Sequence, residues 1–443
     1  MKRLASLLVV CMMLLAMLAA CGDTNTPSTG GGSDPGSGSS GSNGGGSGTT
    51  VPDDGELAPP DDSPVTLRVW MDNDDWAYAV IDAFEDLYPN VTIEYELVGN
   101  VDSRDKISND GPAGIGADVF FVPHDHIGNL VHDGIIEPLP ASLQQKYRGM
   151  LIEPAVETVT MDGDMYAVPI STENIALFYN KDLYGPNPPA TFEEILEFAR
   201  TYNNPAANQW TMTWQLDDSY HNFPWMSAAG LKIFGPNHDD FRNPGFDSPE
   251  VAKGLEYYLM MRETFDVPLS EGTWDNTVAR FQRGEAPFTI SGPWAIADAR
   301  LNNVNFGVAK LPTIEGNQPW AFSGLIVANV SSYSTNQEWA HIFVDFLVSP
   351  KGASIMFEVT GKMTTMIDIH SIPGLADDEH LMGIAEQAPF TVPMPIIPEV
   401  QMMWPALGYL ISSTWDGDLS IPAAQAGAME TYDTLLAAAG QSR

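Results

Sequence analysis

The sequence has very little cysteine, with 2 residues of this type in 443, Cys11 and Cys21. Cys11 lies inside an apolar run from residue 4 to residue 17, which follows Met-Lys-Arg and is too short for a stable membrane span. Because Leu-Ala-Ala directly precedes Cys21, this segment predicts a lipoprotein signal peptide, residues 1–20, with Cys21 as the site of lipidation. A plain signal peptide with a chance cysteine is the alternative. The mature chain would keep one thiol, which excludes a disulfide framework.

Basic residues are also scarce. Lys and Arg number 20 against 58 Asp and Glu, so the formal net charge is -38 at pH 7. Nucleic acid and anionic lipid both bind basic surfaces, and the composition therefore predicts no nucleic-acid partner and no membrane contact except through the lipid anchor. The charge itself names no ligand, because acidic surfaces of this kind usually serve solubility or suit a salty or acidic exterior.

Apolar residues are almost absent from residue 22 to about residue 63, where Gly, Ser, Thr, Pro and Asp dominate. Such a segment cannot bury enough surface to offset the entropy of ordering, so residues 21–63 are expected to be the lipidated cysteine and a flexible linker. Roughly 40 residues of this composition have a root-mean-square reach of about 30 to 40 Å. The rest of the chain is too long for one ordinary core and suits two lobes.

Beyond the linker, the apolar pattern alternates between the periods of strands and helices. Three segments read as strands and one between the first two reads as a helix, namely residues 65–71, 91–98 and 116–122, and residues 75–88. In open parallel sheets ligands gather at the carboxyl ends of the strands. Asp72, Asp74 and Asp125, which follow the first and third strands, are thus expected at one crevice.

The predicted architecture depends most on the stretch from residue 166 to residue 182. It reads as two apolar strand halves separated by a polar turn at Ser171 and Thr172, with Glu173 in the break. A strand that leaves one lobe and enters another fits this pattern, and Glu173 would then face the cleft between the lobes. A kinked strand whose Glu173 points to water is the alternative, and spacing alone leaves both open.

Other candidate motifs are weaker. Aromatic residues are dense between residues 210 and 230 and fit a core or a binding surface, although the interleaved Asp217 and Asp218 favour a site. His124, Asp125 and His126 are a weak hint of a metal site, because neighbouring loop side chains rarely complete a coordination sphere. Since the sequence also has no Gly-rich phosphate loop, we expect neither metal nor cofactor.

Several motifs carry a family resemblance. They are Tyr-Asn-Lys-Asp-Leu at 179–183, Asn-Pro-Pro-Ala-Thr-Phe-Glu-Glu at 187–194 and Ser-Gly-Pro-Trp at 291–294, within segments 117–139, 167–195, 281–300, 306–326 and 392–412. They resemble the maltose/maltodextrin-binding proteins of extracellular solute-binding family 1, the sugar-capturing components of ABC importers. The resemblance implies an α/β, two-lobe periplasmic-binding-protein fold of type II, in which each lobe is a mainly parallel sheet covered by helices and three crossings join the lobes. The amino lobe would be residues 64–171 and 327–375, and the carboxyl lobe residues 176–318 and 383–443.

The resemblance also implies a sugar site, whose contacts map onto Asp74, Asp125, Glu173, Asp218, Tyr220, Trp294, Met394 and Trp404. This set is chemically sensible, because the C–H faces of pyranose rings pack on aromatic rings and vicinal hydroxyls donate hydrogen bonds to carboxylates. Three positions depart from the family pattern: Asp75 and His126 stand where cations are expected, and Val122 stands where a tryptophan is expected.

We therefore predict a monomeric, lipid-anchored protein outside the cytoplasm that captures maltose or maltodextrin-type oligosaccharides by cleft closure and delivers them to ABC importer permease subunits. It is expected not to be an enzyme. One alternative is the same fold with another ligand, such as trehalose, another oligosaccharide or a polyol. The other is a surface glycoside hydrolase that uses Glu173 and Asp218, which would require the two acids to lie about 5 to 10 Å apart.

Overall fold

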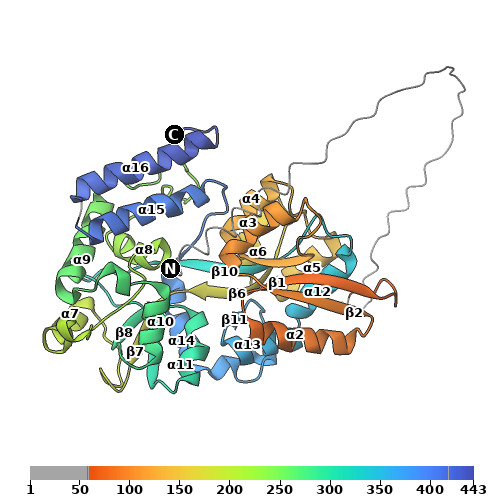
Figure 1. The fold of residues 1–443 in the computed structure, drawn as a ribbon, viewed down its shortest axis with the longest axis horizontal. Helices are drawn as coiled ribbons and strands as arrows, with labels where there is room; N and C mark the ends of the chain where they lie inside the picture. The colour runs from red at the N-terminus through yellow and green to blue at the C-terminus, as the bar shows by residue number, and fades with distance from the viewer. Residues whose placement is uncertain (1–56, 58, 418) are drawn as a thin grey trace, which may run out of the picture. The chain divides into compact units, whose positions relative to one another are not determined.

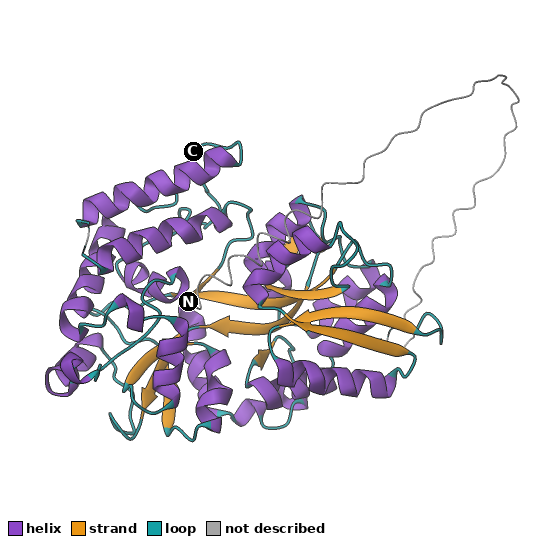
Figure 2. Cartoon of the chain, viewed as in Figure 1, coloured by secondary structure: helices purple, strands orange, loops and turns teal. Residues whose placement is uncertain are grey.

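The computed structural model describes residue 57, residues 59–417 and residues 419–443. The predicted signal peptide, Cys21 and most of the predicted linker lie outside these residues. The described residues all belong to one compact unit, and strands and helices alternate along it, which confirms the α/β class (Figures 1 and 2). None of the helices in this part of the chain combines the length and apolar character needed to cross a bilayer.

The larger of the sheets has seven strands in the order β11-β6-β10-β3-β1-β2, with β12 beside β10. Its strands are β1 (Val65–Met71), β2 (Val91–Leu97), β3 (Val119–Pro123), β6 (Val168–Asn174), β10 (Ala321–Val330), β11 (Met363–Thr364) and β12 (Thr391–Pro393). β1 pairs in parallel with β2 and β3, as predicted, whereas β10 runs antiparallel to both β3 and β6. The carboxyl ends of β1 and β3 therefore lie at the same edge of the sheet.

The helix α2 (Asp74–Leu87) connects β1 to β2 and shows why this unit forms. Asn73 caps the helix, because its side chain accepts a hydrogen bond from the backbone N–H of Trp76. Trp76, Val80 and Phe84 recur at helical spacing and are buried, and the ring of Trp76 meets that of Phe121 on β3 edge-on at 5.5 Å. The cap at Asn73 thus starts the helix just beyond the carboxyl end of β1, and the packing of its apolar face holds it against the sheet.

The smaller sheet has three strands, in the order β8-β7-β9, with bounds β7 (Ala176–Asn180), β8 (Phe288–Ser291) and β9 (Phe306–Ala309). Both pairs in it are antiparallel, so the prediction of a mainly parallel sheet in the carboxyl lobe is wrong. β8 and β9 do run in the same direction and are joined by a helical crossover, as parallel strands require. β7 enters between them from the larger sheet and runs in the opposite direction. A separate hairpin consists of β4 (Thr160–Met161) and β5 (Asp164–Met165).

Helices complete two hydrophobic cores (Figure 1). The larger sheet is accompanied by α2, α3 (Asn100–Asp110), α4 (Ile127–His132), α5 (Ala141–Met150), α6 (Glu153–Thr158), α12 (Gln337–Leu347) and α13 (Pro350–Thr360). The smaller sheet is accompanied by α7 (Phe192–Tyr202), α8 (Ser219–Ala228), α9 (Pro249–Phe265), α10 (Trp274–Gln282), α11 (Ile296–Leu301), α14 (Glu379–Gln387), α15 (Val400–Trp415) and α16 (Ile421–Ala438). We call the core that contains the larger sheet the first core, and it extends through Phe178, Phe306 and Leu381 onto one face of the smaller sheet. The core that contains α8, α9, α15 and α16 is the second core.

The second core resolves the alternative left open for the aromatic segment. Trp214 and Trp225 are buried in it and contact each other edge-on at 5.8 Å, and Trp214 also contacts Trp415 at 5.6 Å. Most aromatic rings of this segment therefore belong to the hydrophobic core. Tyr220 is the exception, because it is only partly buried against this core and lines the site described below.

The crossing between the cores differs in detail from its prediction. Ser171, Thr172 and Glu173 do not form a turn: they belong to β6, which ends at Asn174 and is separated from β7 by Ile175 alone. Their backbone is held in the extended conformation because β10 pairs with β6 on one side and β11 on the other. β10 also passes from the second core, through Phe322, to the first core, through Val327. The precise lobe boundaries stay a prediction.

Candidate ligand-binding site

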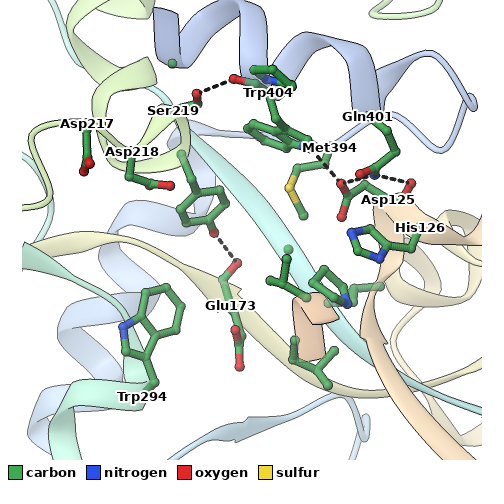
Figure 3. A pocket seen from close by; sticks show the side chains of 18 residues that line it. Asp125, His126, Glu173, Asp217, Asp218, Ser219, Trp294, Met394, Gln401 and Trp404 are labelled. Carbon is green, nitrogen blue, oxygen red and sulfur yellow. Dashed lines mark hydrogen bonds between the residues drawn. The ribbon is translucent and has the colours of Figure 1, made fainter. Parts of the chain in front are cut away.

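A cavity of about 660 Å³ lies where residues of both cores meet (Figure 3). Its walls come from η1 (His124–His126), which follows β3, from β6 and β10, and from α8 and α15. Of the predicted site residues, the structure brings together Asp125, Glu173, Asp218, Tyr220, Trp294, Met394 and Trp404 around this cavity. A cavity of this size is typical of a small-molecule site.

Glu173 reaches the cavity from the crossing strand β6 and is only 9% exposed. Its backbone stands opposite Gly324 of β10. One carboxylate oxygen, Oε1, lies 3.1 Å from Nζ of Lys362 and accepts a hydrogen bond of 3.4 Å from Ser171 Oγ. The alternative in which Glu173 points to bulk water is therefore wrong.

Asp125 connects the first core to helix α15. Its Oδ2 atom accepts hydrogen bonds from Gln401 Nε2 at 2.8 Å and from the indole N–H of Trp404 at 3.0 Å (Figure 3). Gln401 also donates to the backbone carbonyl of Asp125 at 3.2 Å. Asp125, which follows β3 of the first core, thus orients the ring of Trp404, which belongs to α15 of the second core, at the wall of the cavity.

Three aromatic rings line the cavity. Trp294 follows a Gly-Pro turn, and a Cβ at Gly292 would lie 2.3 Å from its ring, so only glycine lets the indole fold back at this point. Tyr220 on α8 lies 6.4 Å from Trp294, centroid to centroid, and its hydroxyl donates to the carbonyl of Phe322 at 3.3 Å. Trp404 meets Phe322 edge-on at 5.4 Å. These rings offer flat apolar surface that suits the C–H faces of a sugar.

Asp218 has two roles in the structure. It caps α8, because its carboxylate accepts from the backbone N–H of His221 at 2.9 Å and lies 2.6 Å from His221 Nδ1. Burial alone would raise the pKa of Asp218, but the hydrogen bonds and charge of His221 lower it below its usual value. The side chain is still 34% exposed and lines the cavity, so an ionised acceptor is available there.

No lysine or arginine is among the described residues that line the cavity. His126 does line it and is 4% exposed, and its Nδ1 atom has no hydrogen-bond partner in the described chain. Burial lowers the pKa of His126, so the ring is neutral at pH 7. The cavity therefore offers carboxylates, neutral polar groups and aromatic rings, which suits a neutral, hydroxyl-rich ligand and disfavours an anion.

His124 is occupied by backbone contacts. Its Nδ1 accepts from the N–H of Leu325 at 3.0 Å, and its Nε2 lies 2.9 Å from the carbonyl of Met394, which fits a neutral ring with the proton on Nε2. Within the described part of the chain, no group of three or more His, Cys, Asp and Glu residues is arranged to hold a metal ion.

Asp74 is the predicted site residue that the structure does not bring to the cavity. It lies at the exposed start of α2, where its carboxylate accepts from Tyr95 Oη at 2.9 Å. Val122, one of the three departures, is fully buried in β3 and does not line the cavity.

Gln401, at the cavity, and Lys362, next to it, are polar residues that were not predicted. Gln401 could be identified from the sequence, because it lies three residues before Trp404 and therefore on the same helix face. Pro405 and Gly408 on this face also line the cavity. Lys362 could not be identified in this way, since its contact with Glu173 depends on strand pairing between distant segments.

Comparison with known proteins places the chain among binding proteins. The family model for "Bacterial extracellular solute-binding protein" matches residues 79–383. The galactooligosaccharide-binding protein of Bacillus subtilis (strain 168) is 28% identical over 303 residues, which cover 67% of this chain and 71% of the relative. The maltotriose-binding protein of Pyrococcus abyssi (strain GE5 / Orsay) is 26% identical over 322 residues, which cover 71% of this chain and 69% of the relative.

Solved structures agree on the fold. A cyclo/maltodextrin-binding protein complexed with maltotetraose matches with a TM-score of 0.71 and 27% identity, covering 85% of this chain and 99% of the other. The Thermus thermophilus maltotriose binding protein bound with maltotriose matches with a TM-score of 0.77 and 25% identity, covering 83% of this chain and 100% of the other. These likenesses confirm the predicted two-lobe sugar-binding-protein fold.

Proposed function

Because the chain belongs to the family of bacterial extracellular solute-binding proteins, we propose that it captures neutral α-linked gluco-oligosaccharides, with maltotriose and related maltodextrins first, for an ABC importer. The importer's permease subunits would be its protein partners. The ligand would be held in the cavity between the two cores, and the protein would close over it.

The observation that carries this proposal is the composition of the cavity wall. Trp294, Tyr220 and Trp404 provide aromatic surface, and Asp125, Glu173 and Asp218 provide carboxylates. Carboxylates accept strong hydrogen bonds from hydroxyls, and aromatic rings pack against pyranose C–H groups. Since no Lys or Arg of the described chain lines the cavity, phosphorylated sugars and uronic acids are poor candidates.

A second candidate ligand comes from one of the relatives. The galactooligosaccharide-binding protein of Bacillus subtilis (strain 168) shares 28% identity with this chain. Galactose differs from glucose in the orientation of one hydroxyl, so the same aromatic and acidic wall could serve either sugar with a shifted hydrogen bond. Galacto-oligosaccharides are therefore the second candidate.

Hydrolysis is disfavoured by the electrostatics of the two candidate acids. A glycosidase needs one carboxylic acid that stays protonated near neutral pH. The pKa of Asp218 is lowered by His221, and Glu173 lies 3.1 Å from the Lys362 ammonium. Incubation with maltotriose should release no glucose.

Attachment to the outer face of the membrane through Cys21 is part of the proposal. It rests on the sequence around Cys21 and on a relative named as a maltooligosaccharide ABC transporter solute-binding lipoprotein in Streptococcus pneumoniae (strain ATCC BAA-255 / R6). The Cys21→Ser variant should leave the membrane fraction. A variant that stays membrane-bound would contradict lipidation at Cys21.

Titration calorimetry against a sugar panel tests the proposed ligand. The panel contains maltose, maltotriose, a cyclodextrin, trehalose, cellobiose and a galacto-oligosaccharide. We expect tightest binding of maltotriose or a longer maltodextrin and no detectable binding of cellobiose. Tightest binding of the galacto-oligosaccharide would favour the second candidate, and binding of none of them would contradict an oligosaccharide ligand.

A further inference from the structure

A buried lysine lies directly behind the cavity. Lys362 sits between α13 and β11, and its side chain is 8% exposed. Helix α13 ends at Thr360 and is capped by Gly361, whose φ of 68° is in the left-handed region that glycine adopts readily, so the chain reverses there and enters β11. The antiparallel register pairs Met363 with Thr172, and the next pair along this ladder brings Lys362 beside Glu173.

The ammonium of Lys362 joins two carboxylates from separate segments. Nζ lies 3.1 Å from Glu173 Oε1 and 3.5 Å from Asp72 Oδ2, and Asp72 also accepts a hydrogen bond of 2.7 Å from Asn100. Burial alone would lower the pKa of Lys362, but the two carboxylates raise it well above its usual value, so the side chain stays charged. Lys362 therefore carries a full positive charge next to Glu173 at neutral pH.

Two contacts of Glu173 converge on one of its carboxylate oxygens. In the described part of the chain, the ion pair with Lys362 and the hydrogen bond from Ser171 both go to Oε1. Glu173 also lines the cavity. A carboxylate fixed through one oxygen presents the other in a defined direction, which lowers the entropic cost of accepting a ligand hydroxyl.

We propose that Lys362 is a positioning residue for ligand binding: it does not line the cavity, and it acts by fixing the side chain of Glu173 at the cavity wall. This inference rests on the proposed function. It assigns a binding role to a residue far from the cavity-lining segments in sequence, at the point where β11 meets the crossing strand.

Loss of the cation would leave the buried carboxylate of Glu173 and the partly exposed carboxylate of Asp72 without the charge that lies between them, so that they repel each other. One of them would then take up a proton more readily as the pH falls, and a protonated or rotated Glu173 would be a weaker acceptor. The other titratable groups that face this region are Tyr220 on α8 and, farther along the cavity, Asp125, His126 and Asp218. The wild type and the variants all contain these groups, so their contribution to the pH dependence of affinity cancels when wild type and variant are compared at each pH.

The experiment measures maltotriose affinity by calorimetry at pH 8 and pH 5.5. Lys362→Met should weaken binding about tenfold at pH 8, since a charge-assisted hydrogen bond is lost or misdirected, and by a larger factor at pH 5.5. Lys362→Arg should restore most of the affinity at both pH values. Lys146→Met is the matched control, because it breaks another ion pair, 2.8 Å from Asp345, away from the cavity, and it should leave affinity unchanged.

A double-mutant cycle with Glu173→Gln separates positioning from stability. If Lys362 acts through Glu173, adding Lys362→Met to Glu173→Gln should cost little further affinity. Additive losses, or wild-type affinity of Lys362→Met at both pH values with only a lower melting temperature, would overturn the proposal.

A second variant covers the case in which Lys362→Met does not fold. Lys362→Gln combined with Asp72→Asn removes one cation and one anion together, so no like-charge repulsion with Asp72 remains, and it should show a similar loss of affinity at pH 8 because Lys362 no longer holds Glu173. Wild-type affinity in this variant would equally overturn the proposal. Failure of the wild type to bind any sugar of the panel would overturn the proposed function and this inference together, whereas unchanged variants of a binding wild type would overturn the inference alone.

Discussion

Glu173 is the residue on which the binding proposal depends most. Its buried carboxylate lines the cavity and is fixed on one side by Lys362. Replacement by glutamine removes a charged acceptor, so Glu173→Gln should weaken sugar binding by about 1.5 to 3 kcal/mol. Calorimetry with maltotriose measures the difference.

Asp74→Asn is the natural control for that change. Asp74 was predicted at the same site, but it lies outside the cavity and accepts from Tyr95. A surface substitution of this kind should change the affinity by less than about 0.5 kcal/mol. Equal effects of the two substitutions would contradict the assignment of the site to the cavity.

The tryptophans supply the apolar half of the site. Trp294 and Trp404 line the cavity from different segments, and Trp404 is oriented by its hydrogen bond to Asp125. Each change to alanine should cost about 1 to 3 kcal/mol of sugar affinity, because a stacking ring in a closed cavity is lost. Sugar should also shift or quench the tryptophan fluorescence of the wild type. Unchanged affinity in both folded variants would contradict stacking.

The residues that could be predicted are those that a short motif marks. Trp294 follows Ser-Gly-Pro, and Glu173 stands between two apolar strand halves, so both were recognisable in the sequence. Gln401 could have been added from the helical period of α15. Lys362 could not, because Glu173 and Asp72 are more than a hundred residues away in sequence and only the tertiary fold brings them to it.

At the scale of elements, β6 shows how strand pairing overrides local sequence. Ser171, Thr172 and Glu173 form a polar group that predicts a turn, yet they stay extended because β10 pairs with all three and β11 pairs with the first two from the other side. Neither neighbour is close in sequence. The existence of the crossing was predictable from the two apolar halves, but its uninterrupted geometry was not.

Helix α8 should show a dependence of stability on pH through its cap. The pKa of Asp218 is lowered in the folded state, so its contribution to stability is full above the ordinary pKa of an aspartic acid, about 3.9, and is lost as the pH falls through the lower folded value. Asp218→Ala should lower the free energy of unfolding by about 0.5 to 2 kcal/mol at pH 7, and less at pH 2. Urea unfolding at both pH values measures this. A loss that does not shrink at pH 2 would contradict the charged cap.

At the scale of the whole described chain, the α/β class and the two-lobe fold were predictable from alternating periods and from the family resemblance. The direction of the strands in the smaller sheet was not. β7 has the composition of a buried strand in either direction, and its antiparallel pairing with β8 and β9 follows from its entry out of the crossing.

The cavity joins groups from both cores, and this predicts closure on binding. Asp125 comes from the first core, Trp404 from the second and Glu173 from the crossing. A ligand drives closure only through its greater affinity for the closed state, and contacts with both cores at once provide that difference. Small-angle scattering should show a smaller radius of gyration with saturating maltotriose. An unchanged radius, with binding demonstrated, would contradict closure.

The central claim is that this cavity binds a neutral gluco-oligosaccharide through its aromatic and acidic walls. A crystal structure of the complex with maltotriose tests it most directly. The account predicts glucose rings packed against Trp294 and Trp404, with hydroxyls donating to Glu173. Maltotriose bound elsewhere on the molecule, or in the cavity without contact to these three side chains, would contradict it.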